Sequence, residues 1–132
     1  MAEKRISIIN KTRGILPRVA FATLKDAVLG PRYDLSVALL SPREARRMSK
    51  KTKHRDVPSN VLAFPFSKYT GEILLCPATA RAQARAYGAT RDNFLAYLFI
   101  HGMLHLKGYA HNATMEHSER RLIKRFKIAI SF

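Results

Sequence analysis

The sequence predicts an α+β domain in which a small, mixed, four-stranded sheet packs against about five helices, one of them central and buried. Segments with strand patterns and segments with helix patterns follow one another in the order β-α-β-α-β-β-α-α-α. The chain has 132 residues, a length typical of one domain. Apolar residues make up 47% of it, which is enough for a hydrophobic core. We therefore expect one domain over residues 1–132.

Four segments have the pattern of strands. They are residues 4–10, 33–40, 59–66 and 71–76. Leu35, Val37 and Leu39 alternate with other residues, which is the period of a strand with one buried face. The last two segments flank a turn near SKYTG, so they predict a hairpin.

Five segments have the pattern of helices. They are residues 16–30, 41–51, 77–88, 91–108 and 115–130. In the first, Pro17 stands near the start and Gly30 just past the end. In the second, Ser41 and Glu44 form a capping box. Gly88 closes the third.

The helix expected over residues 91–108 is apolar almost all round, so it should lie at the centre of the fold. Asp92 is its expected cap and Gly108 its expected stop. The last helix is amphipathic. The residues expected to face the core from it are Met115, Leu122, Phe126 and Ile130.

The chain is strongly basic. It has 24 Lys and Arg against 9 Asp and Glu, a net charge of +15. This excess favours a polyanionic partner such as nucleic acid, through attraction of phosphates and counterion release; the alternative is that it serves solubility. Residues 41–55 and 119–127 are the densest basic stretches, and each could also be an ordinary solvated helix face.

Compartment and membrane signals point to the cytoplasm. No apolar leader follows the basic N-terminus, so we expect no signal peptide. Apolar runs such as residues 94–100 are too short to span a bilayer, which argues against a membrane protein. The one cysteine, Cys76, cannot form an internal disulfide, as expected in a reducing compartment.

Three histidines lie within the eleven residues HGMLHLKGYAH. His101 and His105 are four apart on a predicted helix, so they share one face and can bind one zinc ion. Gly108 stops the helix and lets the chain turn back, which can bring His111 to the same ion. Three protein ligands leave a fourth position open, the arrangement of a catalytic zinc site. The alternative is that the histidines are near one another by chance.

Position 102 separates this motif from the zinc proteases that share its spacing. Those proteases carry a general-base Glu directly after the first histidine, whereas this chain has Gly102. A water on the metal can still attack an electrophile without that Glu. In so basic a chain the expected electrophile is a phosphodiester.

HGMLHLKGYAH, with SNVLAFPF and GEILLC upstream, resembles the YbeY family of bacterial ribosomal-RNA maturation factors. The family motif is H-G-x-L-H-L-x-G-Y-D-H, and the likeness runs from about residue 35 to residue 125. The resemblance implies a small sheet with helices packed on it. It also implies a zinc-dependent endoribonuclease (a hydrolase) that cuts single-stranded RNA with a metal-bound water and acts in ribosome biogenesis. Ribosomal RNA or the small ribosomal subunit would then be the partner; the oligomeric state stays open.

The resemblance also assigns site residues. His101, His105 and His111 become the zinc ligands, and the strand SNVLAFPF lines the cleft beside them. A basic side chain upstream would hold a phosphate and stabilise the transition state. The family pattern there is Y-R-G-K-D-K-P. This chain has TKHRDVP, so Lys53 or Arg55 takes that role. A three-histidine site also accepts other late transition metals.

The chain departs from the family pattern where Ala110 replaces an Asp that could orient a ligand or take a proton. Glu72 replaces an Asp and could act as a carboxylate behind a ligand, or merely end a strand. Glu116 and His117 could assist proton transfer, but an exposed helix face is the simpler expectation.

Two other functions stay open: a metalloprotease, and a non-catalytic RNA-binding assembly factor with structural zinc. Attack by the 2′-hydroxyl of the RNA is a second possible route of cleavage.

Overall fold

The computed structural model describes residues 5–53 and 60–131. The described elements follow the predicted order, with one short 3-10 helix, η1, added. They are β1 (Ile6–Asn10), α1 (Phe21–Val28), β2 (Asp34–Leu39), α2 (Pro42–Lys53), β3 (Val61–Ser67), β4 (Thr70–Leu75), α3 (Pro77–Ala84), η1 (Arg85–Tyr87), α4 (Arg91–Leu106) and α5 (Ala113–Arg125). Within the described ranges this confirms the α+β fold class.

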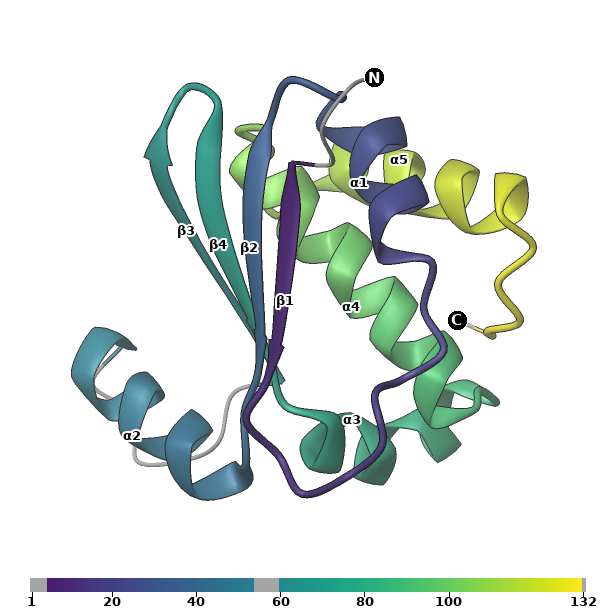
Figure 1. The fold of residues 1–132 in the computed structure, drawn as a ribbon. Coiled ribbons are helices and arrows are strands. Elements are labelled where there is room, and N and C mark those ends of the chain that lie inside the picture. The colour runs from purple at the N-terminus through teal and green to yellow at the C-terminus, as the bar shows by residue number, and fades with distance from the viewer. Residues whose placement is uncertain (1–4, 54–59, 132) are drawn as a thin grey trace.

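The four strands form one mixed sheet in the order β1-β2-β4-β3. β1, β2 and β4 are parallel, and β3 pairs antiparallel with β4 as a hairpin. The hairpin turn therefore lies at the amino end of the parallel strands, while α2 and α3 begin at their carboxyl end (Figure 1). β3 is an edge strand, so one side of its backbone has no strand neighbour in the described sheet.

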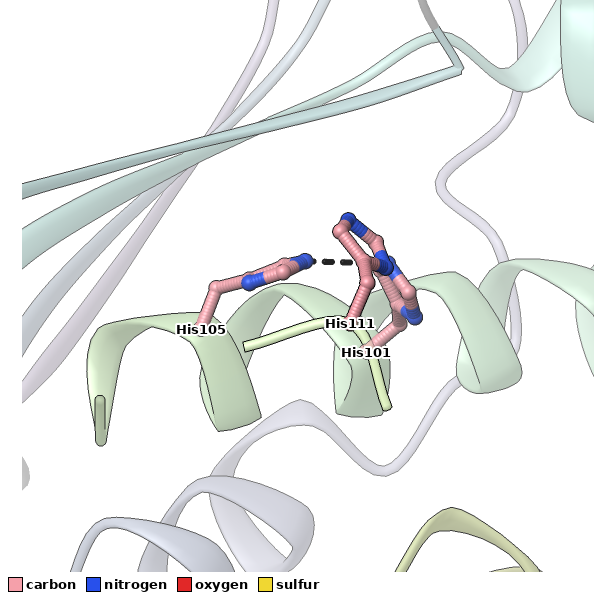
Figure 2. Close-up of side chains that lie close together, drawn as sticks. All are labelled: His101, His105 and His111. Carbon is pink, nitrogen blue, oxygen red and sulfur yellow. Dashed lines mark hydrogen bonds between the residues drawn. The ribbon is translucent and has the colours of Figure 1, made fainter. Parts of the chain in front are cut away.

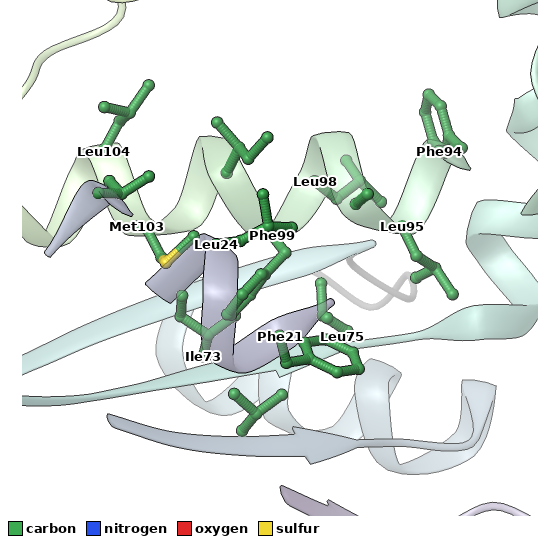
Figure 3. Close-up of a cluster of buried hydrophobic side chains, with 14 of the residues drawn as sticks. Phe21, Leu24, Ile73, Leu75, Phe94, Leu95, Leu98, Phe99, Met103 and Leu104 are labelled. Atoms are coloured by element: carbon green, nitrogen blue, oxygen red, sulfur yellow. The ribbon is translucent and has the colours of Figure 1, made fainter. Parts of the chain in front are cut away.

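Helices cover both faces of the sheet. α1, α4 and α5 lie on one face and α2 lies on the other (Figure 1). The main core fills the space between α4 and the sheet (Figure 3), and three of its side chains, Leu95, Phe99 and Ile100, are fully buried. A smaller cluster that includes Ala45 and Leu62 lies beneath α2. This arrangement confirms the prediction of a central buried helix.

The first helix is shorter than the sequence predicts, because α1 begins at Phe21 and not near Pro17. The backbone NH of Val19 donates to the Pro17 carbonyl, and the NH of Phe21 donates to the Val19 carbonyl. These bonds close tight three-residue turns, which replace a helical turn. The NH of Arg18 is also taken up by the Asp92 carboxylate at 3.1 Å.

That contact explains a second correction. Asp92 does not cap α4; the cap is Thr90, whose hydroxyl accepts from the NH of Asn93 at 3.1 Å. The carboxylate of Asp92 instead binds Arg91 and the backbone of the preceding loop. Thr at a cap accepts the same helical NH that Asp would, so the carboxylate is available for tertiary contacts.

The last helix is also displaced from its predicted bounds. α5 starts at Ala113, capped by Asn112, and ends at Arg125. Lys127 has a φ of +53°, a left-handed conformation that stops the helix. Ile130 therefore lies outside the helix, although it still packs against the core. Across residues 5–53 and 60–131, no helix is both long and apolar enough to cross a membrane.

Tyr33 offers a test of the core. Its side chain is buried, and its hydroxyl has no hydrogen-bond partner in the described part of the chain. A buried unsatisfied hydroxyl is unfavourable, so we expect Tyr33→Phe to raise the free energy of unfolding by about 1 kcal/mol. Thermal unfolding measures this. Tyr97→Phe is the matched control and should lose stability, because the Tyr97 hydroxyl binds Glu119; a loss in both variants would contradict the prediction.

Candidate metal centre

The C-terminal half of α4 and the turn after it bring three imidazoles together (Figure 2). His101 and His105 lie one turn apart on α4. Gly108 has a φ of +105°, and the NH of Tyr109 returns to the Leu104 carbonyl, so the chain reverses after the helix. His111 then faces the other two, and one nitrogen from each ring lies within 4.8 Å of the others. The three histidines could therefore hold one metal ion.

The Nδ1 atoms of the two helical histidines already have partners. His105 Nδ1 lies 3.1 Å from the Tyr109 carbonyl, which can only accept. His101 Nδ1 lies 3.0 Å from Glu119 Oε1. Both rings therefore carry their proton on Nδ1 and present the lone pair of Nε2. Partners of this kind fix the orientation of histidine ligands in metal sites.

The two Nε2 atoms face each other at 3.2 Å (Figure 2). Two lone pairs this close repel unless a proton or a metal ion lies between them. Two nitrogens at 2.0–2.1 Å from a tetrahedral zinc ion stand about 3.3 Å apart. The donor set and its spacing therefore fit a metal bound through Nε2.

The surroundings keep His105 in the form that binds metals. Burial lowers the pKa of His105, and the neighbouring His101 and His111 lower it further. A neutral imidazole has a free lone pair, whereas a protonated one has none. Protons therefore compete less strongly for His105 than for a solvent-exposed histidine.

Glu119 is a functional residue that the sequence interpretation missed. It is only 5% exposed, on α5, and binds His101. Burial raises the pKa of Tyr97, and Glu119 raises it further, so the phenol stays protonated and donates to the carboxylate. The signal was available in the sequence: Met115, Glu119 and Leu122 follow helical spacing, which places an acid in the apolar stripe of α5.

A cleft of about 490 Å³ opens beside the histidines. One wall is the edge strand β3, through Val61 to Phe64. The other is α4, through His101, Gly102 and His105. Thr52 and Asn60 also line it. For Asn60 to Phe64, the lining agrees with the expectation that this segment runs along the cleft.

The sheet packs tightly against α4 at position 102. Gly102 is buried, and a Cβ there would lie 3.1 Å from Val61 Cγ2 and 3.3 Å from Ile73 Cδ1. The helix can approach the sheet this closely because residue 102 is glycine. The general-base Glu of a protease would have to displace these neighbours.

This contact predicts that Gly102→Ala destabilises the protein by about 1–2 kcal/mol, because Ile73 is fully buried and cannot move aside freely. Thermal or denaturant unfolding measures the change. Lys107→Ala, at the exposed end of α4, is the control and should change stability little. Higher stability of Gly102→Ala, from the better helix propensity of alanine, would contradict this account.

The other predicted site residues have different outcomes. For Glu72, the structure excludes the alternative of a carboxylate behind a ligand. Ile73 faces α4, so strand alternation turns Glu72 to the opposite face, where it lies near Arg47 and Glu44. Glu116 and His117 are exposed, as expected, and so is Ala110.

The two basic candidates lie at the edge of the described structure. Lys53 is the last residue of α2, and its side chain is not described. Arg55 lies outside the described residues.

Comparison with known proteins decides the family. The profile of the family described as Endoribonuclease YbeY matches residues 2–127. The chain belongs to this family. The Endoribonuclease YbeY of Alkalilimnicola ehrlichii is 33% identical over an alignment that covers 88% of this chain and 81% of the relative. That of Francisella philomiragia is 26% identical, with coverages of 90% and 85%.

A solved structure has a similar fold. The solution structure of TM1509 from Thermotoga maritima matches with a TM-score of 0.62, over 92% of this chain and 91% of that one. The sequence identity is 23%, so the likeness concerns the fold alone. The sequence resemblance to the YbeY family is confirmed.

Proposed function

We propose that this protein is a zinc-dependent endoribonuclease that cuts single-stranded RNA during ribosomal-RNA maturation in the cytoplasm. Membership of the Endoribonuclease YbeY family supports RNA cleavage. The observation that carries the proposal is the pair of Nε2 atoms facing each other at 3.2 Å in an open cleft, with His111 beside them.

His101, His105 and His111 are the proposed ligands of one zinc ion. Three nitrogen ligands with an open fourth position are typical of catalytic zinc. Bound there, zinc would supply a Lewis acid and lower the pKa of a coordinated water toward neutrality. Hydrogen bonds from His101 to Glu119 and from His105 to the Tyr109 carbonyl would fix the orientation of these two rings as ligands.

Lys53, the last residue of α2, or Arg55 beyond it is proposed to bind the scissile phosphate. Thr52 and Asn60 both line the cleft, and Lys53 and Arg55 lie between them in the sequence. Arg would bind a phosphate through two parallel hydrogen bonds, whereas Lys would attract it as a single compact positive charge.

The remaining positive charge is proposed to hold the RNA backbone without reading its sequence. The net charge of +15 should attract RNA through its phosphates, so binding should weaken steeply as salt rises. Ribosomal RNA, alone or within the small ribosomal subunit, is the substrate that this proposal names.

The test is cleavage of an end-labelled single-stranded RNA, of the same RNA in a duplex, and of casein. We expect the single strand alone to be cut, the activity to disappear with EDTA and to return with zinc. RNA bound but uncut under all conditions would instead support an assembly factor, and cleavage of casein would support a protease. Fragments ending in a 2′,3′-cyclic phosphate would indicate attack by the 2′-hydroxyl.

A further inference from the structure

The β3–β4 hairpin presents two aromatic side chains to solvent. Phe66 is 66% exposed and Tyr69 is 42% exposed. Phe66 lies near the end of β3, where the pairing with β4 is irregular between Pro65 and Ser67, and Tyr69 lies in the turn. The turn is bonded to the sheet, because the Tyr69 carbonyl accepts from the NH of Asp34 at 2.8 Å. The hydroxyls of Ser67 and Thr70 are also bonded to each other, at 2.7 Å. The two rings are thus displayed on a fixed part of the backbone.

Two cations lie close to the Tyr69 ring. The guanidinium of Arg32 lies 5.1 Å from the ring centroid, and the ammonium of Lys68 lies 5.5 Å from it. Arg5 donates to the Arg32 carbonyl and adds a third positive charge, against the carboxylate of Asp34. We call Phe66, Tyr69, Arg32 and Lys68 the aromatic tip. Proteins commonly bind single-stranded nucleic acids with exposed aromatic rings and basic side chains. The bases stack on the rings, and the phosphates form ionic contacts with the basic side chains.

The aromatic tip lies at the end of the hairpin whose first strand, β3, lines the cleft of the candidate metal centre. β3 lines the cleft as far as Phe64. Phe66 follows two residues later, about 7 Å along the strand. β3 leads to the hairpin turn (Figure 1), so a strand of RNA that followed β3 from the cleft would reach the aromatic tip.

We propose that the aromatic tip stacks on an unpaired base of the RNA, a few nucleotides from the bond that is cut. The inference rests on the proposed function, since it takes the bound strand to be the substrate. A base inside a duplex already stacks on its neighbours and cannot lie on a protein ring. The aromatic tip therefore gives the protein a direct way to select single strands.

The chain contains no tryptophan, so Phe66→Trp creates a single fluorescent reporter at the aromatic tip. With EDTA present to prevent cleavage, the variant is titrated with oligouridylate and with an abasic oligonucleotide of equal length and charge. Stacking on a base quenches indole fluorescence, so we expect strong quenching by oligouridylate and little by the abasic strand. Equal quenching by both would mean that only charge acts there and would overturn the proposal.

The affinity of Phe66→Ala gives a second, independent readout. Loss of one stacked base should weaken binding of oligouridylate about tenfold or more, with a much smaller effect on the abasic strand. Ile15→Ala is the matched control, because Ile15 is 87% exposed but lies beyond the carboxyl end of β1, at the opposite end of the parallel strands. Unchanged affinity of Phe66→Ala would overturn the proposal.

The outcomes separate the two proposals. If Phe66→Ala binds weakly but the parent protein never cuts RNA, the aromatic tip stands and the nuclease activity fails. If the parent cuts RNA and Phe66→Ala binds as well as the parent, the aromatic tip alone fails.

Discussion

Substitution of His105 by alanine should abolish zinc binding and reduce RNA cleavage by a factor on the order of 10³ or more. His105 supplies one of the two Nε2 atoms that face each other at 3.2 Å. Its removal leaves two imidazoles, and His111 loses a neighbour whose ring centroid lies 4.3 Å away. Metal analysis of the dialysed protein should fall from about one zinc per chain to none.

His117→Ala is the matched control for this prediction. His117 is an exposed histidine on α5, outside the three-histidine cluster. It should keep its zinc and its activity. Loss of activity in an identically purified His105→Ala protein excludes a contaminating ribonuclease. Zinc should also raise the melting temperature of the parent protein and of His117→Ala, because binding of a ligand stabilises the folded state. It should not raise that of His105→Ala, which does not bind zinc. Full activity in His105→Ala would contradict the assignment.

Substitution of Glu119 should weaken the metal site without removing a ligand. Glu119→Ala leaves the Nδ1–H of His101 and the hydroxyl of Tyr97 without their acceptor in a largely buried place. We expect zinc affinity to fall by about 10- to 100-fold, as for other partners of histidine ligands. Loss of the acceptor should also destabilise the metal-free protein by about 1–3 kcal/mol.

Glu119→Gln separates orientation from charge. Its amide oxygen still accepts a hydrogen bond, so we expect a smaller loss of affinity than in Glu119→Ala. Competition with a chelator of known zinc affinity measures both variants. Glu116→Ala, an exposed acid on the same helix, is the control and should bind zinc as the parent does. An unchanged affinity in Glu119→Ala would show that His101 needs no partner to bind.

The fold was largely predictable because patterning and local signals agree. Strand alternation through Leu35, Val37 and Leu39 corresponds to the buried face of β2. Ser41 accepts from the NH of Glu44, as a capping box requires. The predicted start of α1 was wrong because Pro17 is compatible with either a helix or a turn, and tertiary contacts of the loop with Asp92 decide between them.

The site was predictable only in part. Spacing alone places His101 and His105 on one helix face, and Gly108 accounts for the return of His111. Glu119 comes from a different helix, and no local spacing links it to His101. The role of Glu72 stayed open in the sequence because a strand pattern does not show which face meets the metal helix; in the structure Glu72 lies on the opposite face. Residues that contact a metal ligand from a distant part of the sequence therefore cannot be identified from local spacing.

The most direct test of the metal-centre assignment is a zinc titration of the metal-free protein, with the rate of RNA cleavage followed at each addition. The three-histidine site predicts that the rate rises linearly and stops rising at one equivalent of zinc per chain, and that His105→Ala stays inactive throughout. A rate that does not depend on zinc, or one that rises equally in His105→Ala, would contradict the assignment of His101, His105 and His111 as the catalytic metal site.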